Sequence, residues 1–339
     1  MNRTRATAVI AAFAAGTLAL TACGSSSTGA AAGSSSSAAT SASSAAASGG
    51  SSAPSSSAAS SGSSSASAPG GGGTDSVVIG SANFAESVLI ADIYEGALTA
   101  KGVKVTQKPK IGSREVYIPA LKDGSIDLIP EYSGTLLSYF DKNATAVSSE
   151  DVYKALPAAI GSDLKVLDQS QAQDKDSITV SQATADKYKL KSIADLKETA
   201  GDLILGAGPE FKTRSDGVPG LKAKYGVAFG TFKTLDSGGP LTVAGLKNGQ
   251  VDAADLFTTD PAIEANKFVV LEDPQNLYNA QNVLPLINAK KASATVTGAL
   301  NAVSAKLTTE ILLDLNSKVA SGTDAAAVAK AWLQEQKLG

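Results

Sequence analysis

The sequence predicts an α/β fold built from two similar lobes. Short apolar runs alternate with amphipathic helical patterns after residue 75, which is typical of α/β proteins with parallel strands. A seven-residue pattern occurs once in each half of this region. A long stretch of Ser, Ala and Gly stops just before the alternation begins, so the lobes are expected to start there.

The first 23 residues have the layout of a secretory signal peptide. Arg3 and Arg5 precede a short apolar run over 8–20, and Leu20-Thr21-Ala22-Cys23 closes it with small residues. The run is too short to cross a bilayer. Its Leu-x-Ala-Cys ending resembles the bacterial lipobox, in which the cysteine is acylated, and an ordinary signal peptide with an incidental cysteine is the alternative. The expected location is the outer face of the cell membrane, through a lipid anchor at Cys23.

Residues 24–74 are predicted to form a flexible tether. They carry no aromatic residue and no charge, so they bury too little apolar surface to offset the entropy of folding. Roughly 50 such residues reach about 40 Å as a random coil. A glycosylated stalk is the alternative.

The amino-acid composition excludes several classes of catalytic and metal site. The chain has no histidine, which excludes His-based triads, His acid–base catalysis and His metal sites. Cys23 is the only cysteine, so no disulfide forms within the chain. The net charge of -3 and the lack of a basic stripe argue against nucleic acid. An enzyme would have to use carboxylate, lysine or tyrosine chemistry, and no cofactor is expected.

The spacing of apolar residues and the positions of glycine and proline predict the helices and strands. Pro130 is expected to end the second strand, because proline cannot donate a ladder hydrogen bond. Trp332 in the last helix is expected to pack into the core. The predicted strands are 76–80, 126–129, 203–206 and 251–256, and the predicted helices are 86–100, 307–319 and 324–334.

The repeated pattern is Leu-Lys-Asp-Gly-Ser-Ile-Asp at 121–127 and Leu-Lys-Asn-Gly-Gln-Val-Asp at 246–252. In each copy a helix ends at a glycine suited to a left-handed cap, and a strand follows. Continuing both copies in register places Tyr132 opposite Phe257. Ligands of open parallel sheets bind beyond the carboxyl ends of the strands, so these two aromatic residues are expected to face a ligand held between the lobes. Chance recurrence of a helix–glycine–strand pattern is the alternative.

Several ordered motifs resemble one family. They are Asn83-Phe84-Ala85-Glu86, Gly112-Ser113-Arg114-Glu115, Pro119-Ala120-Leu121, Gly124-Ser125-Ile126-Asp127, Pro130-Glu131-Tyr132-Ser133-Gly134-Thr135, Gly208-Pro209-Glu210-Phe211, Arg214-Ser215-Asp216-Gly217 and Phe257-Thr258-Thr259-Asp260. Together they resemble the osmoprotectant-binding proteins of ABC importers, which take up glycine betaine, choline and related quaternary amines. The resemblance covers nearly everything after Asp75.

The resemblance implies a two-lobed clamp like the type II periplasmic binding proteins, with two crossover segments. Lobe I would comprise 75–177 plus 284–339, and lobe II 178–283. The implied partners are a small zwitterionic or cationic solute and the transmembrane subunits of an ABC permease. A quaternary ammonium suits a box of aromatic faces, each contributing about 0.5–2 kcal/mol when desolvated. A ligand carboxylate suits an arginine fork and a hydroxyl donor.

Five residues acquire roles from the resemblance. Tyr132 matches a cage tyrosine, and Phe257 falls at or beside a second aromatic position. Thr135 and Arg214 match the hydroxyl and the arginine that bind the ligand carboxylate, and Glu86 lies where relatives place a polar residue near the ligand. Four of them have a structural alternative: a capping box for Glu86, helix-start packing for Tyr132, a surface ion pair for Arg214 and plain core for Phe257.

Two positions depart from the family pattern. Asp176 and Gln281 occupy positions where the family carries tyrosines, so the cage is expected to be wetter and more acidic. Such a cage suits a primary or secondary amine, which makes glycine betaine itself less favoured; solvent-exposed hinge residues are the alternative. A binding protein that delivers solute to a permease is the leading hypothesis. A carboxylate-based hydrolase and a non-transport receptor are the competing ones.

Overall fold

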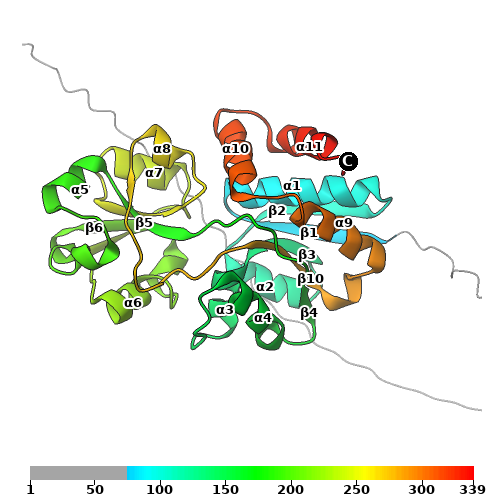
Figure 1. Cartoon of the computed structure of the whole chain (residues 1–339), viewed down its shortest axis with the longest axis horizontal. Helices are drawn as coiled ribbons and strands as arrows, with labels where there is room; N and C mark the ends of the chain where they lie inside the picture. The colour runs from blue at the N-terminus through cyan, green and yellow to red at the C-terminus, as the bar shows by residue number, and fades with distance from the viewer. Residues whose placement is uncertain (1–74) are drawn as a thin grey trace, which may run out of the picture. The chain divides into compact units, whose positions relative to one another are not determined.

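The computed structural model describes residues 75–339, and the signal peptide predicted over 1–23, Cys23 and the tether predicted over 24–74 lie outside them. The described chain contains two five-stranded sheets, ordered β2-β1-β3-β10-β4 and β7-β6-β8-β5-β9 (Figure 1). The strands of the first are β1 (Ser76–Ala82), β2 (Lys104–Gly112), β3 (Leu128–Tyr132), β4 (Leu164–Val166) and β10 (Val283–Asn288). Those of the second are β5 (Asp176–Val180), β6 (Ile204–Ala207), β7 (Thr231–Thr234), β8 (Ala253–Phe257) and β9 (Val269–Val270).

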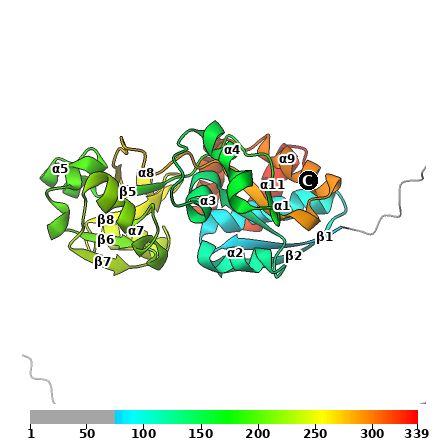
Figure 2. The same ribbon diagram turned by 90° about the horizontal axis from the view of Figure 1, so that it is seen from below.

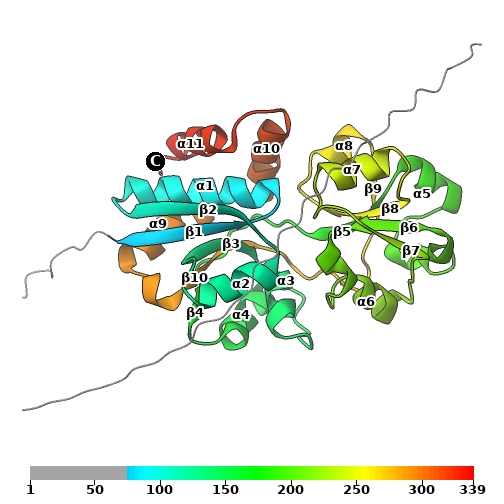
Figure 3. The same cartoon turned by 180° about the vertical axis from the view of Figure 1, so that it is seen from behind.

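Helices cover both faces of the first sheet (Figures 1 and 3). One buried apolar cluster includes Leu89, Leu300 and Trp332, which come from three helices on one face. A second includes Leu121, Leu136 and Leu156 on the other face. Trp332 is a core residue as predicted. The helices of this lobe are α1 (Ala85–Ala100), α2 (Arg114–Lys122), α3 (Ser133–Phe140), α4 (Ser149–Ile160), α9 (Ala294–Ser304), α10 (Thr309–Ala320) and α11 (Ala325–Glu335).

The second lobe is smaller and has shorter helices. Figure 2 shows β7, β6 and β8 side by side, in the order that their pairing gives. Its core includes Ile178, Leu205 and Phe211. Its helices are α5 (Gln182–Tyr188), α6 (Val218–Gly220), α7 (Pro240–Lys247) and α8 (Ala262–Ala265), with single turns at η1 (Ile193–Leu196), η2 (Ala200–Asp202), η3 (Pro209–Lys212) and η4 (Leu221–Tyr225); η5 (Ala289–Lys291) follows β10 in the first lobe.

Both sheets are mixed rather than wholly parallel, which corrects the sequence-based expectation. β1 pairs in parallel with β2 and β3, and β6 does so with β7 and β8. The strand that enters from the other lobe runs antiparallel in each case: β10 against β3, and β5 against β8. The two lobes therefore share one topology, and each receives one strand through a crossover.

The repeated pattern folds identically in both lobes. Asp127 N donates to Val78 O at 2.7 Å, and Val78 N donates to the Asp127 carboxylate at 2.9 Å. Asp252 and Ile204 form the same reciprocal pair, at 2.9 Å in both directions. The aspartate that ends each copy thus links β1 to β3 in the first lobe and β6 to β8 in the second. The two copies therefore occupy equivalent positions in the two lobes.

Pro130 does not end a strand as predicted; it lies in the middle of β3, opposite Pro285 of β10. β1 pairs with β3 at Leu128 alone, so the missing N–H of Pro130 breaks no rung between these strands. The strand consequently runs on to Tyr132.

Within residues 75–339, no helix has the length and apolar character needed to span a membrane.

Candidate ligand-binding cavity

A cavity of about 560 Å³, including its open mouth, lies beyond the carboxyl ends of the parallel strands of both sheets. This is where the sequence predicted a ligand. Lobe I contributes Ala82, Asn83, Phe84, Ser113, Arg114, Tyr117, Tyr132 and Thr135, the crossover segments contribute Asp174, Asp176 and Gln281, and lobe II contributes Glu210, Phe211, Arg214, Ser237, Asp255 and Phe257.

The cavity brings together most of the residues singled out from sequence. Six of them line it: Tyr132, Thr135, Asp176, Arg214, Phe257 and Gln281. Glu86 does not; it lies behind Tyr132, whose hydroxyl donates to Glu86 Oε1 at 2.7 Å. That the lining residues bind ligand remains a prediction.

Aromatic rings from both lobes meet in the cavity. Phe84 lies 5.9 Å from the Tyr132 ring and 4.9 Å from the Phe257 ring, measured between centroids. Phe84 and Tyr132 come from lobe I, and Phe257 ends β8 of lobe II. A side chain at Gly238 would place its Cβ 2.8 Å from the Phe257 ring, so glycine is needed there. The three rings offer apolar, electron-rich faces suited to an alkylated cation.

Glu86 is a buried junction between segments. Its Oε2 accepts hydrogen bonds from the Thr259 hydroxyl and the Asn316 amide, both at 2.5 Å. Burial raises the pKa of Glu86, and these bonds and that from Tyr132 oppose the rise. The capping-box alternative is wrong, because the N-cap of α1 is Phe84 and no side chain caps it. Glu86 therefore supports the wall of the cavity through Tyr132.

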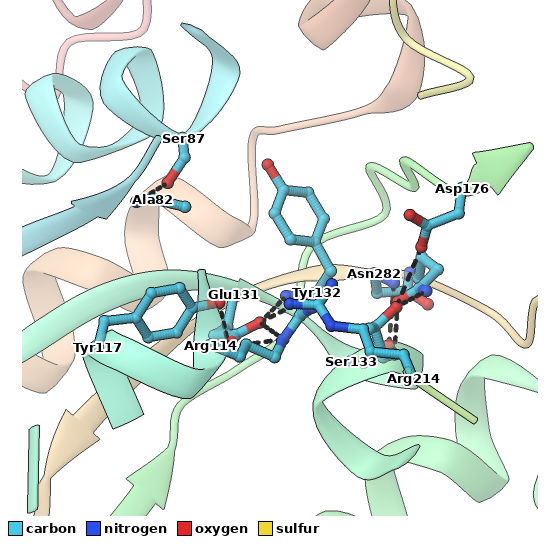
Figure 4. Close-up of polar contacts among 12 residues, drawn as sticks. Ala82, Ser87, Arg114, Tyr117, Glu131, Tyr132, Ser133, Asp176, Arg214 and Asn282 are labelled. Carbon is cyan, nitrogen blue, oxygen red and sulfur yellow. Dashed lines mark hydrogen bonds and ion pairs between the residues drawn. The ribbon is translucent and has the colours of Figure 1, made fainter. Parts of the chain in front are cut away.

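Arg114 is a lining residue to which sequence reasoning gave no role. Its Nε and Nη2 donate to the Glu131 carboxylate at 3.0 and 2.9 Å, and the Tyr117 hydroxyl donates to the same carboxylate at 2.8 Å (Figure 4). Glu131 is 0% exposed, and its Oε2 also accepts from Tyr132 N at 2.9 Å. The pair thereby fixes the backbone of Tyr132. A glutamate within a buried strand was the available signal, because a buried carboxylate needs a partner.

Arg214 bridges the lobes. Its Nε and Nη2 donate to the two carboxylate oxygens of Glu115 in α2, both at 3.0 Å. Partial burial would raise the pKa of Glu115, but the bonds from Arg214 and Ser113 lower it to about 2. The arginine assigned to a ligand carboxylate thus already holds a carboxylate of the protein.

Thr135, the second residue predicted to bind a ligand carboxylate, also has partners within the protein. Its hydroxyl donates to Asp176 Oδ2 at 3.3 Å, its backbone N–H donates to Gln281 Oε1 at 2.8 Å, and the Gln281 amide contacts its hydroxyl oxygen. Gln281 is buried, so the exposed-hinge alternative is wrong for this residue. Burial raises the pKa of Asp176 to about 6; Asp216 adds to the rise, while Arg214 and Arg114 oppose it.

The lining is acidic once these pairs are counted. Each lining arginine is bonded to a glutamate outside the lining, Arg114 to Glu131 and Arg214 to Glu115. None of the ion pairs between residues 75 and 339 involves a lining carboxyl group. Those groups belong to Asp174, Asp176, Glu210 and Asp255. A cavity with aromatic faces and unneutralised acids favours a small organic cation. The described residues contain no group of acids placed to hold a metal ion.

The two lobes share one topology, two crossover segments join them, and residues of both line the cavity. These features define a two-lobed solute-binding protein. The chain belongs to the family described as the substrate binding domain of the ABC-type glycine betaine transport system, whose model matches residues 75–335. This confirms the predicted family, fold class and binding function. It also corrects the two competing hypotheses, since the members of this family are transport receptors and not enzymes.

Relatives agree with this assignment. The chain is 28% identical over 275 residues to the glycine betaine-binding protein YehZ of Escherichia coli, covering 77% of this chain and 90% of the relative. It is 26% identical to the carnitine transport binding protein OpuCC of Listeria monocytogenes, covering 71% and 80%. The solved structure of apo YehZ superimposes with a TM-score of 0.55 at 27% identity, covering 79% of this chain and 100% of that one. A glycine betaine/carnitine/choline transporter structure gives 0.61 at 24% identity, covering 77% and 99%.

Proposed function

We propose that this protein is the lipid-anchored, extracytoplasmic receptor of an ABC importer, and that it binds a small organic cation of the choline and glycine betaine class. The observation that carries the proposal is the meeting of aromatic rings from both lobes with lining acids that have no cationic partner. The cation contributes the missing positive charge and lays its alkyl groups on Phe84, Tyr132 and Phe257.

The contacts favour members of this class that lack a carboxylate. Arg214 donates two hydrogen bonds to Glu115, and Thr135 contacts Asp176, so both predicted carboxylate-binding residues already have acidic partners. A zwitterion must compete with Glu115 for the arginine. Choline needs no such exchange, and it is the first ligand to test.

Domain organisation follows from the crossovers. We assign lobe I to 75–177 plus 284–339 and lobe II to 178–283, with the ligand held between them. The supporting features are the start of β5 at Asp176 and of β10 at Val283, which carry the chain from one sheet to the other.

The anchor is assigned to Cys23, with 24–74 as the tether. Leu20-Thr21-Ala22-Cys23 supports acylation, because it follows a signal-like apolar run and the chain has no other cysteine. Several acyl chains, at about 0.8 kcal/mol per buried methylene, hold a protein on a membrane. Cys23→Ser is expected to move the protein from the membrane fraction to the medium or the soluble extracytoplasmic fraction. Retention in the membrane would contradict the assignment.

Calorimetric titration with choline and with its uncharged carbon isostere, 3,3-dimethylbutanol, tests the ligand class. Choline is expected to bind one molecule per chain at pH 7.5, and the isostere to bind at least tenfold more weakly because it supplies no charge, a loss of about 1.4 kcal/mol. Choline affinity is expected to fall about tenfold by pH 5. The sign follows from the pKa of Asp176, about 6: below it the carboxylate gains a proton and no longer attracts the cation.

Asp176→Asn is the matched control for this titration. It is expected to bind choline more weakly at pH 7.5 and to lose much of the dependence between pH 5 and 7.5, because the carboxylate that titrates there is gone. Equal binding of the isostere, or choline binding that strengthens toward pH 5, would contradict a cationic site.

A further inference from the structure

One carboxylate of the cavity lacks a partner within the protein. Asp255 is 4% exposed and lines the cavity, and its Oδ1 accepts no hydrogen bond from any residue of 75–339. The hydroxyl of Tyr278, also buried, has no partner within this region either. Buried polar groups in folded proteins are nearly always paired. An unpaired carboxylate in the wall of a ligand cavity therefore points to a donor that the ligand supplies.

The position of Asp255 places it beside the aromatic wall. β5 and β8 pair antiparallel, with Asp176 opposite Phe257 and Ile178 opposite Asp255. Opposite residues share a face of the sheet, and so do residues two apart on one strand. Asp255, Asp176 and Phe257 thus lie on the same face. A cation that contacts the Phe257 ring therefore has the carboxylates of Asp176 and Asp255 at neighbouring positions of the sheet.

Two donors that line the cavity from lobe II, Ser237 and Arg214, are already engaged. The Ser237 hydroxyl donates to Glu210, and Arg214 donates to Glu115. Burial, followed by the charges of Asp176 and Glu210, raises the pKa of Asp255 well above its ordinary value. The protein itself thus offers Asp255 too little compensation for a buried negative charge.

We propose that Asp255 accepts a hydrogen bond from the cationic nitrogen of the solute, so that the natural ligand is a protonated amine with at least one N–H rather than a quaternary ammonium. The inference rests on the proposed function, because it assumes that a small organic cation occupies the cavity. A quaternary nitrogen turns only methyl groups toward the carboxylate and leaves it without a donor. A tertiary or secondary ammonium donates to Asp255 and still lays methyl groups on the three rings.

A methylation series tests this directly. Choline, N,N-dimethylethanolamine, N-methylethanolamine and ethanolamine share one hydroxyl and one positive charge at pH 7.5, and differ in the number of N–H groups. Calorimetric titration of the whole protein is expected to show dimethylethanolamine binding about tenfold or more tightly than choline, the effect of one hydrogen bond between charged groups. Binding is also expected to release a proton from Asp255, so the measured enthalpy should vary with the ionisation enthalpy of the buffer.

Asp255→Asn provides the variant, and Asp260→Asn the matched control. Asp260 is a partly buried acid in the same lobe outside the cavity lining, where its carboxylate accepts a hydrogen bond from Ala262 N. We expect Asp255→Asn to bring dimethylethanolamine and choline within about twofold of each other, and Asp260→Asn to keep the preference.

The outcomes separate the two proposals. Choline binding as tightly as dimethylethanolamine to the wild-type protein would overturn the inference and leave the proposed function standing, and so would a preference that survives in Asp255→Asn or an equal loss for all four ligands. No binding by any of the four, nor by glycine betaine, would overturn the proposed function and the inference with it. The wild-type ranking decides the matter even where the variant does not fold.

Discussion

Arg114→Ala is expected to lower the free energy of unfolding by about 3–5 kcal/mol, the usual cost of leaving a buried charge without its partner. Glu131 is 0% exposed, and both guanidinium donors that reach it come from Arg114. The Tyr117 hydroxyl and Tyr132 N–H remain, but they are neutral donors. Denaturant titration of the purified protein, with an unchanged m value, measures the loss.

Arg214→Ala is the matched control for this experiment. Arg214 also forms two hydrogen bonds with a glutamate, but the Glu115 side chain is 45% exposed. A pair in contact with solvent contributes about 1 kcal/mol or less. The double variant Arg114→Met, Glu131→Leu removes both charges together and is expected to recover most of the stability. A loss below about 1 kcal/mol for Arg114→Ala would mean that Glu131 is not the buried charge described here.

Tyr132→Ala is expected to weaken choline binding by about 2 kcal/mol, the contribution of a desolvated cation–π contact. It also removes the hydroxyl that donates to the buried Glu86 carboxylate at 2.7 Å. Tyr132 is 6% exposed and its ring packs in the apolar core of lobe I, so the free energy of unfolding should fall as well, by about 3–5 kcal/mol. Calorimetry measures the first effect, and denaturant titration the second.

Tyr132→Phe separates the ring from the hydroxyl. The ring is kept, so choline affinity is expected to stay within about threefold of wild type. The bond to Glu86 is lost, so the free energy of unfolding should fall by about 1–3 kcal/mol. The fall should be smaller than in Tyr132→Ala, because the buried ring is kept. Equal affinity in the alanine variant and the wild type would remove this ring from the binding site.

Much of the fold could be predicted because its determinants are local. The two copies of the repeated pattern end in Asp127 and Asp252, which make the same reciprocal bonds to β1 and β6 respectively. The repeated local sequence therefore predicted that the two lobes share one topology. The antiparallel strands β5 and β10 could not be predicted in the same way, because each pairs with a strand far away in sequence.

The site was predicted where a residue faces the cavity, and missed where a partner decides the role. Tyr132 and Phe257 end equivalent strands, so register alone placed them. Arg114 was missed because its partner Glu131 lies in another element. Asp255 was missed although it interrupts an apolar strand, Ala253–Phe257. An acid in a strand with otherwise buried neighbours signals the need for a partner, in the protein or in a ligand, because burial of an unpaired carboxylate is costly.

The most direct test of the central claim, that one organic cation is held between aromatic rings of both lobes, is a crystal structure of the protein with the tightest-binding amine of the choline series. The nitrogen is expected within about 6 Å of the centroids of Phe84, Tyr132 and Phe257. A hydrogen bond to Asp255 is expected on its other side. A ligand bound outside this cavity, or with its nitrogen turned away from the three rings, would contradict the account.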